Sequence, residues 1–150
     1  MRKIYFIIIL FFCLFIVGCS RGIPFEVHKL SNVNTITDQD DVYFFSEYQE
    51  YDKYCDEIAE NFDFNEHFAA RLYYYDEDYF EEHYLIVVYY TASSSDKISI
   101  KRLMLIENTV SIELKIKKSH IISEFIEQRC YFIEVEKVYD IVDASLHVNK

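Results

Sequence analysis

The chain has 150 residues, 26 of them acidic and 15 basic, and its formal net charge at pH 7 is −11. An acidic chain of this kind repels nucleic acid and anionic lipid head groups, so we expect no nucleic-acid partner. Hydrophobic residues make up 51% of the sequence, which excludes a disordered chain, and the length suffices for one domain with its own core.

Glycine and proline are nearly absent. The two glycines, Gly18 and Gly22, and the single proline, Pro24, all precede Phe25. Glycine-rich phosphate loops, the dinucleotide-binding fingerprint and the nucleophile elbow of serine hydrolases each need backbone conformations that glycine supplies. The residues from Phe25 onward therefore exclude these three classes of site.

Residues 1–19 have the organisation of a secretory signal. Arg2 and Lys3 form a basic start, and Ile4 to Val17 is an apolar run of 14 residues. That run is shorter than the roughly 20 apolar residues that a membrane-spanning helix takes. The ending Ile16-Val17-Gly18-Cys19 resembles the lipobox of bacterial lipoproteins, in which the signal is cleaved before a cysteine that receives the lipid.

This resemblance implies a signal peptide at residues 1–18, cleavage between Gly18 and Cys19, and a diacylglyceryl group on Cys19. Residues 19–24 are then the lipidated cysteine and a short tether, and loss of Arg2 and Lys3 changes the net charge to −13. Two or more acyl chains hold a protein stably on a membrane. We expect a lipid-anchored protein of the cell membrane that faces outside the cytoplasm; an uncleaved signal anchor and a plain secreted protein are the alternatives.

Two cysteines remain after the predicted cleavage, Cys55 and Cys130. The expected compartment permits a disulfide between them. The alternative is two separate buried thiols, because free cysteine packs as a small hydrophobic residue.

The first half of the predicted domain contains two short strands and the best helix. Residues 25–30 and 42–45 are strand candidates, separated by a polar, acidic loop. Ser46 opens the helix, with Ser46 and Gln49 at the two positions of a capping box. Its apolar stripe recurs at helical spacing and consists of Tyr48, Tyr51, Cys55, Ile58, Ala59 and Phe62.

A strand, a short helix and a second strand are predicted over residues 69–91. Residues 69–75 are a strand candidate, and Asp76 to His83 has the acids at its start that favour one or two helical turns. Leu85 to Thr91 is apolar without alternation, which is typical of a central strand covered on both faces.

Residues 97–118 form a strong hairpin pattern. Apolar and polar residues alternate from Val110 to Lys117 with the period of a half-buried strand. The partner strand changes phase at Lys101-Arg102, which indicates a bulge, and Glu107-Asn108-Thr109 is the expected turn. Residues 119–128 carry a weak helical pattern.

Two strands are expected near the end of the chain, at residues 129–137 and 146–148. The first has Tyr131, Ile133 and Val135 on one face. Residues 25–150 are thus expected to form one α+β domain, a mostly antiparallel sheet of about five to six strands packed by one main helix.

The stretch from Val42 to about Val138 resembles PrcB-type domains, the C-terminal domains of a protease-complex accessory subunit. The resemblance is carried by Tyr43–Tyr48, Tyr75–Val88 and Phe132–Lys137. Ser93-Ser94-Ser95 stands where such domains have a glycine-containing turn. The resemblance implies an extracytoplasmic accessory or binding domain without known chemistry.

Metal and catalytic sites find little support in the sequence. The acids from Asp76 to Glu82 lack the spaced ligand pattern and the glycine of a calcium loop, and a solvated helix start explains them. His67 and His83 each follow a glutamate, but no HExxH motif accompanies them or His120. No spacing places a nucleophile beside a base, so we expect no metal, no cofactor and no enzyme.

Aromatic residues suggest a binding surface instead. Tyr79, Tyr84 and Tyr89 are candidates for an exposed patch that contacts a protein, and the alternative is that they pack in the core. The sequence therefore predicts a membrane-anchored protein-binding or accessory module whose partner is another envelope protein. An acidic metal- or small-ligand-binding envelope protein is the second candidate.

Overall fold

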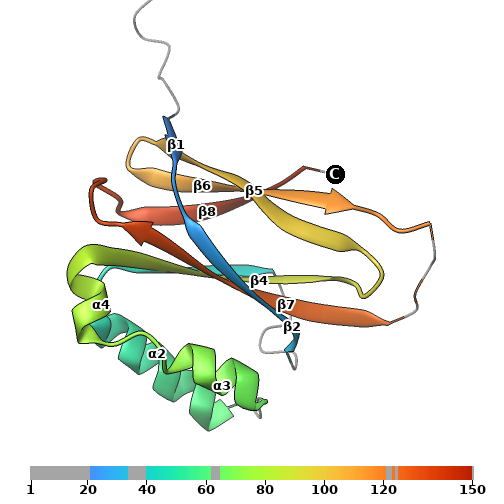
Figure 1. The fold of residues 1–150 in the computed structure, drawn as a ribbon, viewed down its shortest axis with the longest axis horizontal. Coiled ribbons are helices and arrows are strands. Elements are labelled where there is room, and N and C mark those ends of the chain that lie inside the picture. The colour runs from blue at the N-terminus through green and yellow to red at the C-terminus, as the bar shows by residue number, and fades with distance from the viewer. Residues whose placement is uncertain (1–20, 34–39, 62–64, 121–122, 124, 150) are drawn as a thin grey trace, which may run out of the picture.

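The computed structural model describes residues 21–33, 40–61, 65–120, 123 and 125–149. They form three stacked layers: helices, a central four-stranded sheet and an outer four-stranded sheet (Figure 1). The predicted α+β class is confirmed. The finer prediction of one sheet of about five to six strands with one main helix is wrong, because the described residues hold eight strands in two sheets and three helices.

The outer sheet consists of β1 (Arg21–Ile23), β5 (Lys97–Ile106), β6 (Thr109–Lys117) and β8 (Asp143–Asn149), in that order. β5 runs antiparallel to β1 and to β6, whereas β8 runs parallel to β6. β8 contains the predicted strand at residues 146–148. β1 pairs with β5 and buries Ile23, so residues 21–23, which fall within the predicted tether at residues 19–24, form a strand of the outer sheet.

The central sheet consists of β2 (Glu26–Val33), β7 (Ile126–Glu136), β4 (His83–Ser93) and β3 (Asp41–Phe45), in that order. All neighbouring strands in it are antiparallel. These four strands confirm the predictions at residues 25–30, 42–45, 85–91 and 129–137, with different bounds. The described part of residues 119–128 contains no helix.

Three helices, α2 (Tyr48–Asn61), α3 (Glu66–Leu72) and α4 (Glu77–Glu82), cover the face of the central sheet that is turned away from the outer sheet (Figure 1). The predicted strand at residues 69–75 is wrong. The Asn65 side chain accepts a hydrogen bond of 2.9 Å from the Phe68 amide and so caps α3. Phe68 and Leu72, one helical turn apart, are its buried residues.

The short helix α4 follows its prediction. The Asp76 carboxylate accepts a 3.0 Å hydrogen bond from the Tyr79 amide, which satisfies a free donor of the first turn. None of the helices in the described residues is long and apolar enough to cross a membrane.

Strand β4 is buried on both faces, as predicted. Leu85, Val87 and Tyr89 pack under the helices, while the side chains between them pack against the outer sheet. The residues from Leu85 to Tyr89 are all fully buried. A single sheet with one helical layer would leave half of these apolar side chains in water. The second sheet is needed to cover the side chains of β4 that point away from the helices.

The β5–β6 hairpin has the predicted bulge and turn. Glu107 and Asn108, with φ of 48° and 64°, form its two-residue turn. The register shifts between Ile100 and Arg102, so that Lys101 is the additional residue in β5. Two successive cations consequently reach one carboxylate: Lys101 Nζ lies 2.7 Å from Glu113 Oε1, and Arg102 Nε donates to Glu113 Oε2.

Acid is expected to weaken the fold through Glu113. Hydrogen bonds from Lys101 and Arg102 lower the pKa of Glu113 from 4.5 to about 2. The unfolded chain therefore binds this proton at higher pH than the folded chain, so the contribution of Glu113 is complete above pH ~4.5 and is lost as the pH falls toward about 2. Urea unfolding at several pH values should show a smaller acid loss for Glu113→Gln than for the wild type.

The exposed Glu47→Gln variant is the control and should retain the wild-type pH dependence. An unchanged acid loss in Glu113→Gln would contradict the assignment.

Candidate functional site

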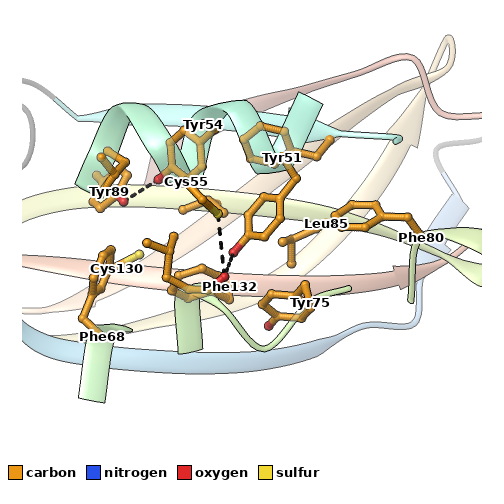
Figure 2. Packing of buried hydrophobic residues seen from close by; sticks show 14 residues of the cluster. Tyr51, Tyr54, Cys55, Phe68, Tyr75, Phe80, Leu85, Tyr89, Cys130 and Phe132 are labelled. Atoms are coloured by element: carbon orange, nitrogen blue, oxygen red, sulfur yellow. Dashed lines mark hydrogen bonds between the residues drawn. The ribbon is translucent and has the colours of Figure 1, made fainter. Parts of the chain in front are cut away.

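The predicted tyrosine patch is wrong. Tyr89 is fully buried under α2, and its hydroxyl lies 2.5 Å from that of Tyr54 (Figure 2). Tyr79 and Tyr84 are only partly exposed, and their hydroxyls donate to the carbonyls of Tyr84 and Tyr139 at 3.2 Å and 3.1 Å. The alternation of β4 sends Tyr89 to the helix-covered face, so these three side chains do not form an exposed surface.

The possible disulfide between Cys55 and Cys130 is also not formed. Both residues are buried free thiols of the core between the helices and the central sheet (Figure 2). Cys55 Sγ donates to the Leu72 carbonyl at 3.8 Å, and Cys130 is hydrogen-bonded with the Tyr89 hydroxyl. Burial raises the pKa of Cys55 to about 12 and that of Cys130 well above its ordinary value. The lipidation residues Gly18 and Cys19 lie outside the described residues.

The acids and histidines weighed in the sequence lie apart. Asp76 caps α4, and His67 and His120 are exposed. The ring of His83 stacks on Tyr79, with centroids 4.9 Å apart.

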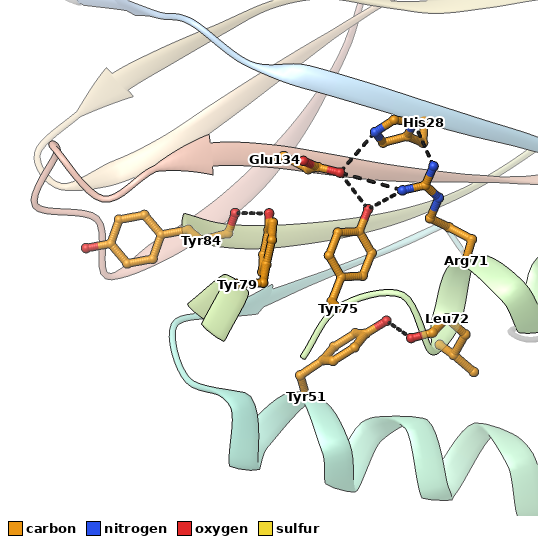
Figure 3. A network of polar contacts seen from close by, with 8 residues as sticks. All are labelled: His28, Tyr51, Arg71, Leu72, Tyr75, Tyr79, Tyr84 and Glu134. Carbon is orange, nitrogen blue, oxygen red and sulfur yellow. Dashed lines mark hydrogen bonds and ion pairs between the residues drawn. The ribbon is translucent and has the colours of Figure 1, made fainter. Parts of the chain in front are cut away.

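A different group of polar side chains meets at one end of the central sheet. Glu26 of β2 pairs with Glu134 of β7, and strand alternation places His28 on the same, helix-covered face. The side chains of Arg71 in α3 and of Tyr75, which follows that helix, point toward Glu134 (Figure 3). We call His28, Arg71, Tyr75 and Glu134 the polar cluster.

Glu134 is the acceptor at the centre of the polar cluster. Its Oε1 atom lies 2.9 Å from His28 Nε2, 3.0 Å from the Tyr75 hydroxyl and 3.7 Å from Arg71 Nη1 (Figure 3). The side chains of Glu134 and Arg71 are 15% and 22% exposed, so this contact is shielded from solvent on most sides. Burial, with the Glu134 charge beside it, raises the pKa of Tyr75, which keeps its hydroxyl a donor.

The contacts define the protonation of His28. Arg71 Nη2 lies 3.0 Å from His28 Nδ1, and a guanidinium can only donate. Nδ1 is therefore the acceptor, and Nε2 carries the proton that faces Glu134. His28 is neutral in this arrangement, held between one cation and one carboxylate.

Glu26, His28 and Glu134 resemble a metal-ligand set, because each offers one ligand atom and these atoms all lie within 4.8 Å of one another. The polar cluster does not fit a resident metal. Metal binding at His28 Nε2 would move the imidazole proton to Nδ1, where a metal-bound histidine normally meets an acceptor. Here it would meet the Arg71 guanidinium instead.

A hollow of about 320 Å³ opens beside the polar cluster. It is lined by carboxylates and two aromatic rings, together with a histidine and a proline: Glu26, Glu134, Glu136, Phe25, Tyr139, His83 and Pro24. A neighbouring hollow shares His83 and Glu136 and adds Glu81, Glu82, Lys137 and Val138. The two form one acidic surface, which we call the acidic hollow.

Lys137 does not neutralise the acidic hollow by an ion pair in the structure. Its Nζ atom donates to the Ser46 carbonyl at 2.6 Å and to the Phe80 carbonyl, and it lies 5.3 Å from the centre of the Tyr84 ring. The acidic hollow therefore suits a cationic group, which carboxylates attract and aromatic faces also favour.

Comparisons with known proteins leave the site without an assignment. No family model matches the chain, and neither a curated protein nor a solved structure matches it. The resemblance to PrcB-type accessory domains remains a prediction.

The polar cluster was not predicted from the sequence, although one signal pointed to it. Residues 130–135 are apolar except for Glu134, in a strand buried on both faces. A lone carboxylate in such a strand needs a partner, because burying an unpaired charge is costly.

Neutralising Glu134 is expected to destabilise the protein. Glu134→Gln keeps the size of the side chain but removes the charge that faces Arg71, His28 and Tyr75, so we expect a loss of about 1–2 kcal/mol in the free energy of unfolding. The exposed Glu136→Gln variant, two residues along the same strand, should change it by less than about 0.5 kcal/mol. If urea unfolding showed the same loss of unfolding free energy for Glu134→Gln and Glu136→Gln, this would contradict the central role of Glu134.

Proposed function

We propose that this chain is a lipid-anchored, extracytoplasmic binding module that serves as an accessory to another envelope protein. The observation that carries the proposal is the lipobox-like ending Ile16-Val17-Gly18-Cys19 after a basic start and an apolar run. Strand β1 begins at Arg21, two residues after the cysteine that would carry the lipid, so cleavage before Cys19 would keep all of the described strands and helices in the mature chain.

The surface of the module that receives its partner is, in this proposal, the acidic hollow. Glu26, Glu134 and Glu136 line it together with His83, and Glu81, Glu82 and Lys137 extend it, so carboxylates outnumber basic side chains there. The ligand is a lysine or arginine side chain of the partner, held by charge and by the rings of Phe25 and Tyr139. A small amine is the alternative ligand for the same chemistry.

The proposed anchor predicts that lipidation of the chain requires Cys19. In bacterial cells that process lipoproteins, the wild type should yield a mature chain that begins at Cys19, carries a diacylglyceryl group by mass spectrometry and partitions into detergent. Cys19→Ala should remain unlipidated, since the acceptor thiol is gone. Cys13→Ala, which removes another cysteine of the same segment, is the control and should behave as the wild type. Lipid on the Cys19→Ala chain would contradict the proposal.

The acidic hollow predicts a position-specific cross-link. A photoreactive residue at Val138, which is 71% exposed and lines the acidic hollow, should capture one recurrent envelope protein in intact cells. The same residue at Ile126, which is 73% exposed at the far end of β7, is the control and should not capture it.

Reversing the charge with Glu136→Lys should abolish the Val138 adduct, because the cationic group would then be repelled. An adduct that survives the reversal, or that forms equally from Ile126, would contradict the assignment. Loss of all adducts together with heat released on titrating a small amine would favour the alternative ligand.

A further inference from the structure

We infer that one corner of the outer sheet rests on the membrane surface, with Ile106 and Val142 entering the head-group region of the bilayer. This corner consists of the β5–β6 turn and residues 140–143, and we call it the membrane corner. The inference rests on the proposed lipid anchor and adds an orientation and a contact surface, neither of which the anchor alone specifies.

The length of chain between the lipid and the fold is the first argument. Only Ser20 separates Cys19 from Arg21, so the Cα atoms of Cys19 and Arg21 are at most about 7 Å apart. Arg21 pairs with Leu105 near the end of β5, and paired Cα atoms lie about 5 Å apart. The backbone of the lipidated cysteine therefore stays within ~12 Å of Leu105, immediately before the β5–β6 turn.

Two exposed apolar side chains at this corner are the second argument. Ile106 is 47% exposed and Val142 is 64% exposed. The Val142 amide donates to the Asn108 carbonyl at 2.9 Å, and the Asn108 side chain donates to Asp140 at 3.0 Å, so the turn and the later segment are joined (Figure 1). Both apolar side chains thus belong to one fixed part of the surface.

The charges of the membrane corner determine how it meets the bilayer. Glu107, Asp140 and Asp143 are exposed around Ile106 and Val142. Carboxylates do not enter hydrocarbon without a large cost, so the contact stays at head-group depth. They also repel anionic lipid, which selects a surface of neutral phospholipid such as phosphatidylcholine.

The opposite end of the sandwich then points away from the membrane. Phe125 and Ile126 are exposed there, and the Ser94 amide donates to the Phe125 carbonyl at 2.9 Å, next to the β4–β5 turn. Strand β7 has 11 residues from Ile126 to Glu136 and spans roughly 35 Å. This apolar end is the matched comparison for the membrane corner.

Depth-dependent quenching tests the orientation. Lipidated protein, purified with its anchor and bound to phosphatidylcholine vesicles, would carry a single fluorophore at Ile106→Cys, Val142→Cys or Phe125→Cys. The wild type is the labelling control, because Cys55 and Cys130 are buried with raised pKa values and should not react. Urea unfolding of each variant verifies that it is folded.

Nitroxide placed at the lipid head group should quench the fluorophore at positions 106 and 142 at least twofold more than at position 125. Equal quenching at the three positions, or stronger quenching at 125, would overturn the orientation while leaving the anchor intact. A mature chain without the diacylglyceryl mass and without vesicle binding would overturn the anchor, and the orientation with it.

Discussion

The rest of the structure depends on strand β4, because the apolar side chains on both of its faces must be buried. Its residues from Leu85 to Tyr89 are fully buried, and they alternate between two separate cores. Each face therefore needs its own cover, the helices on one side and the outer sheet on the other. The polar cluster lies beside a hollow into which carboxylates of the same sheet, Glu26, Glu134 and Glu136, open.

The parts of the fold that the sequence predicted are those encoded within a few residues. The continuous apolar run of β4 and the phase change at Lys101 are local patterns, and each has its expected structure. The alternation of β6 correctly predicted a strand but not a half-buried one, because Ser111 and Glu113 are buried as well. The second sheet was not predictable in this way, because it joins β1 with β5 and β6 with β8 across long stretches of chain. Helix α3 was missed because the tyrosines at residues 73–75 favour a strand, whereas Asn65 and the buried Phe68 and Leu72 determine a helix.

The candidate site was less predictable than the fold for the same reason. His28, Arg71 and Glu134 lie far apart in the sequence, and only the pairing of β2 with β7 under α3 brings them together. Core packing, the alternative for Tyr89, is what the structure has. The Tyr89 hydroxyl pairs with that of Tyr54, a contact between a strand and a helix that local sequence patterns do not predict.

The crossing of the chain from β1 to β2 has a mechanical consequence for a protein held by its N-terminus. Under the proposed anchor, tension applied at Cys19 would act first on β1, which is held to β5 by three residue pairs, from Arg21 to Ile23. Beyond Pro24 and Phe25 the load meets β2, which is paired along the much longer β7. β1 is thus the element that detaches first, and its release would lengthen the tether while the strand pairing of the central sheet stays intact.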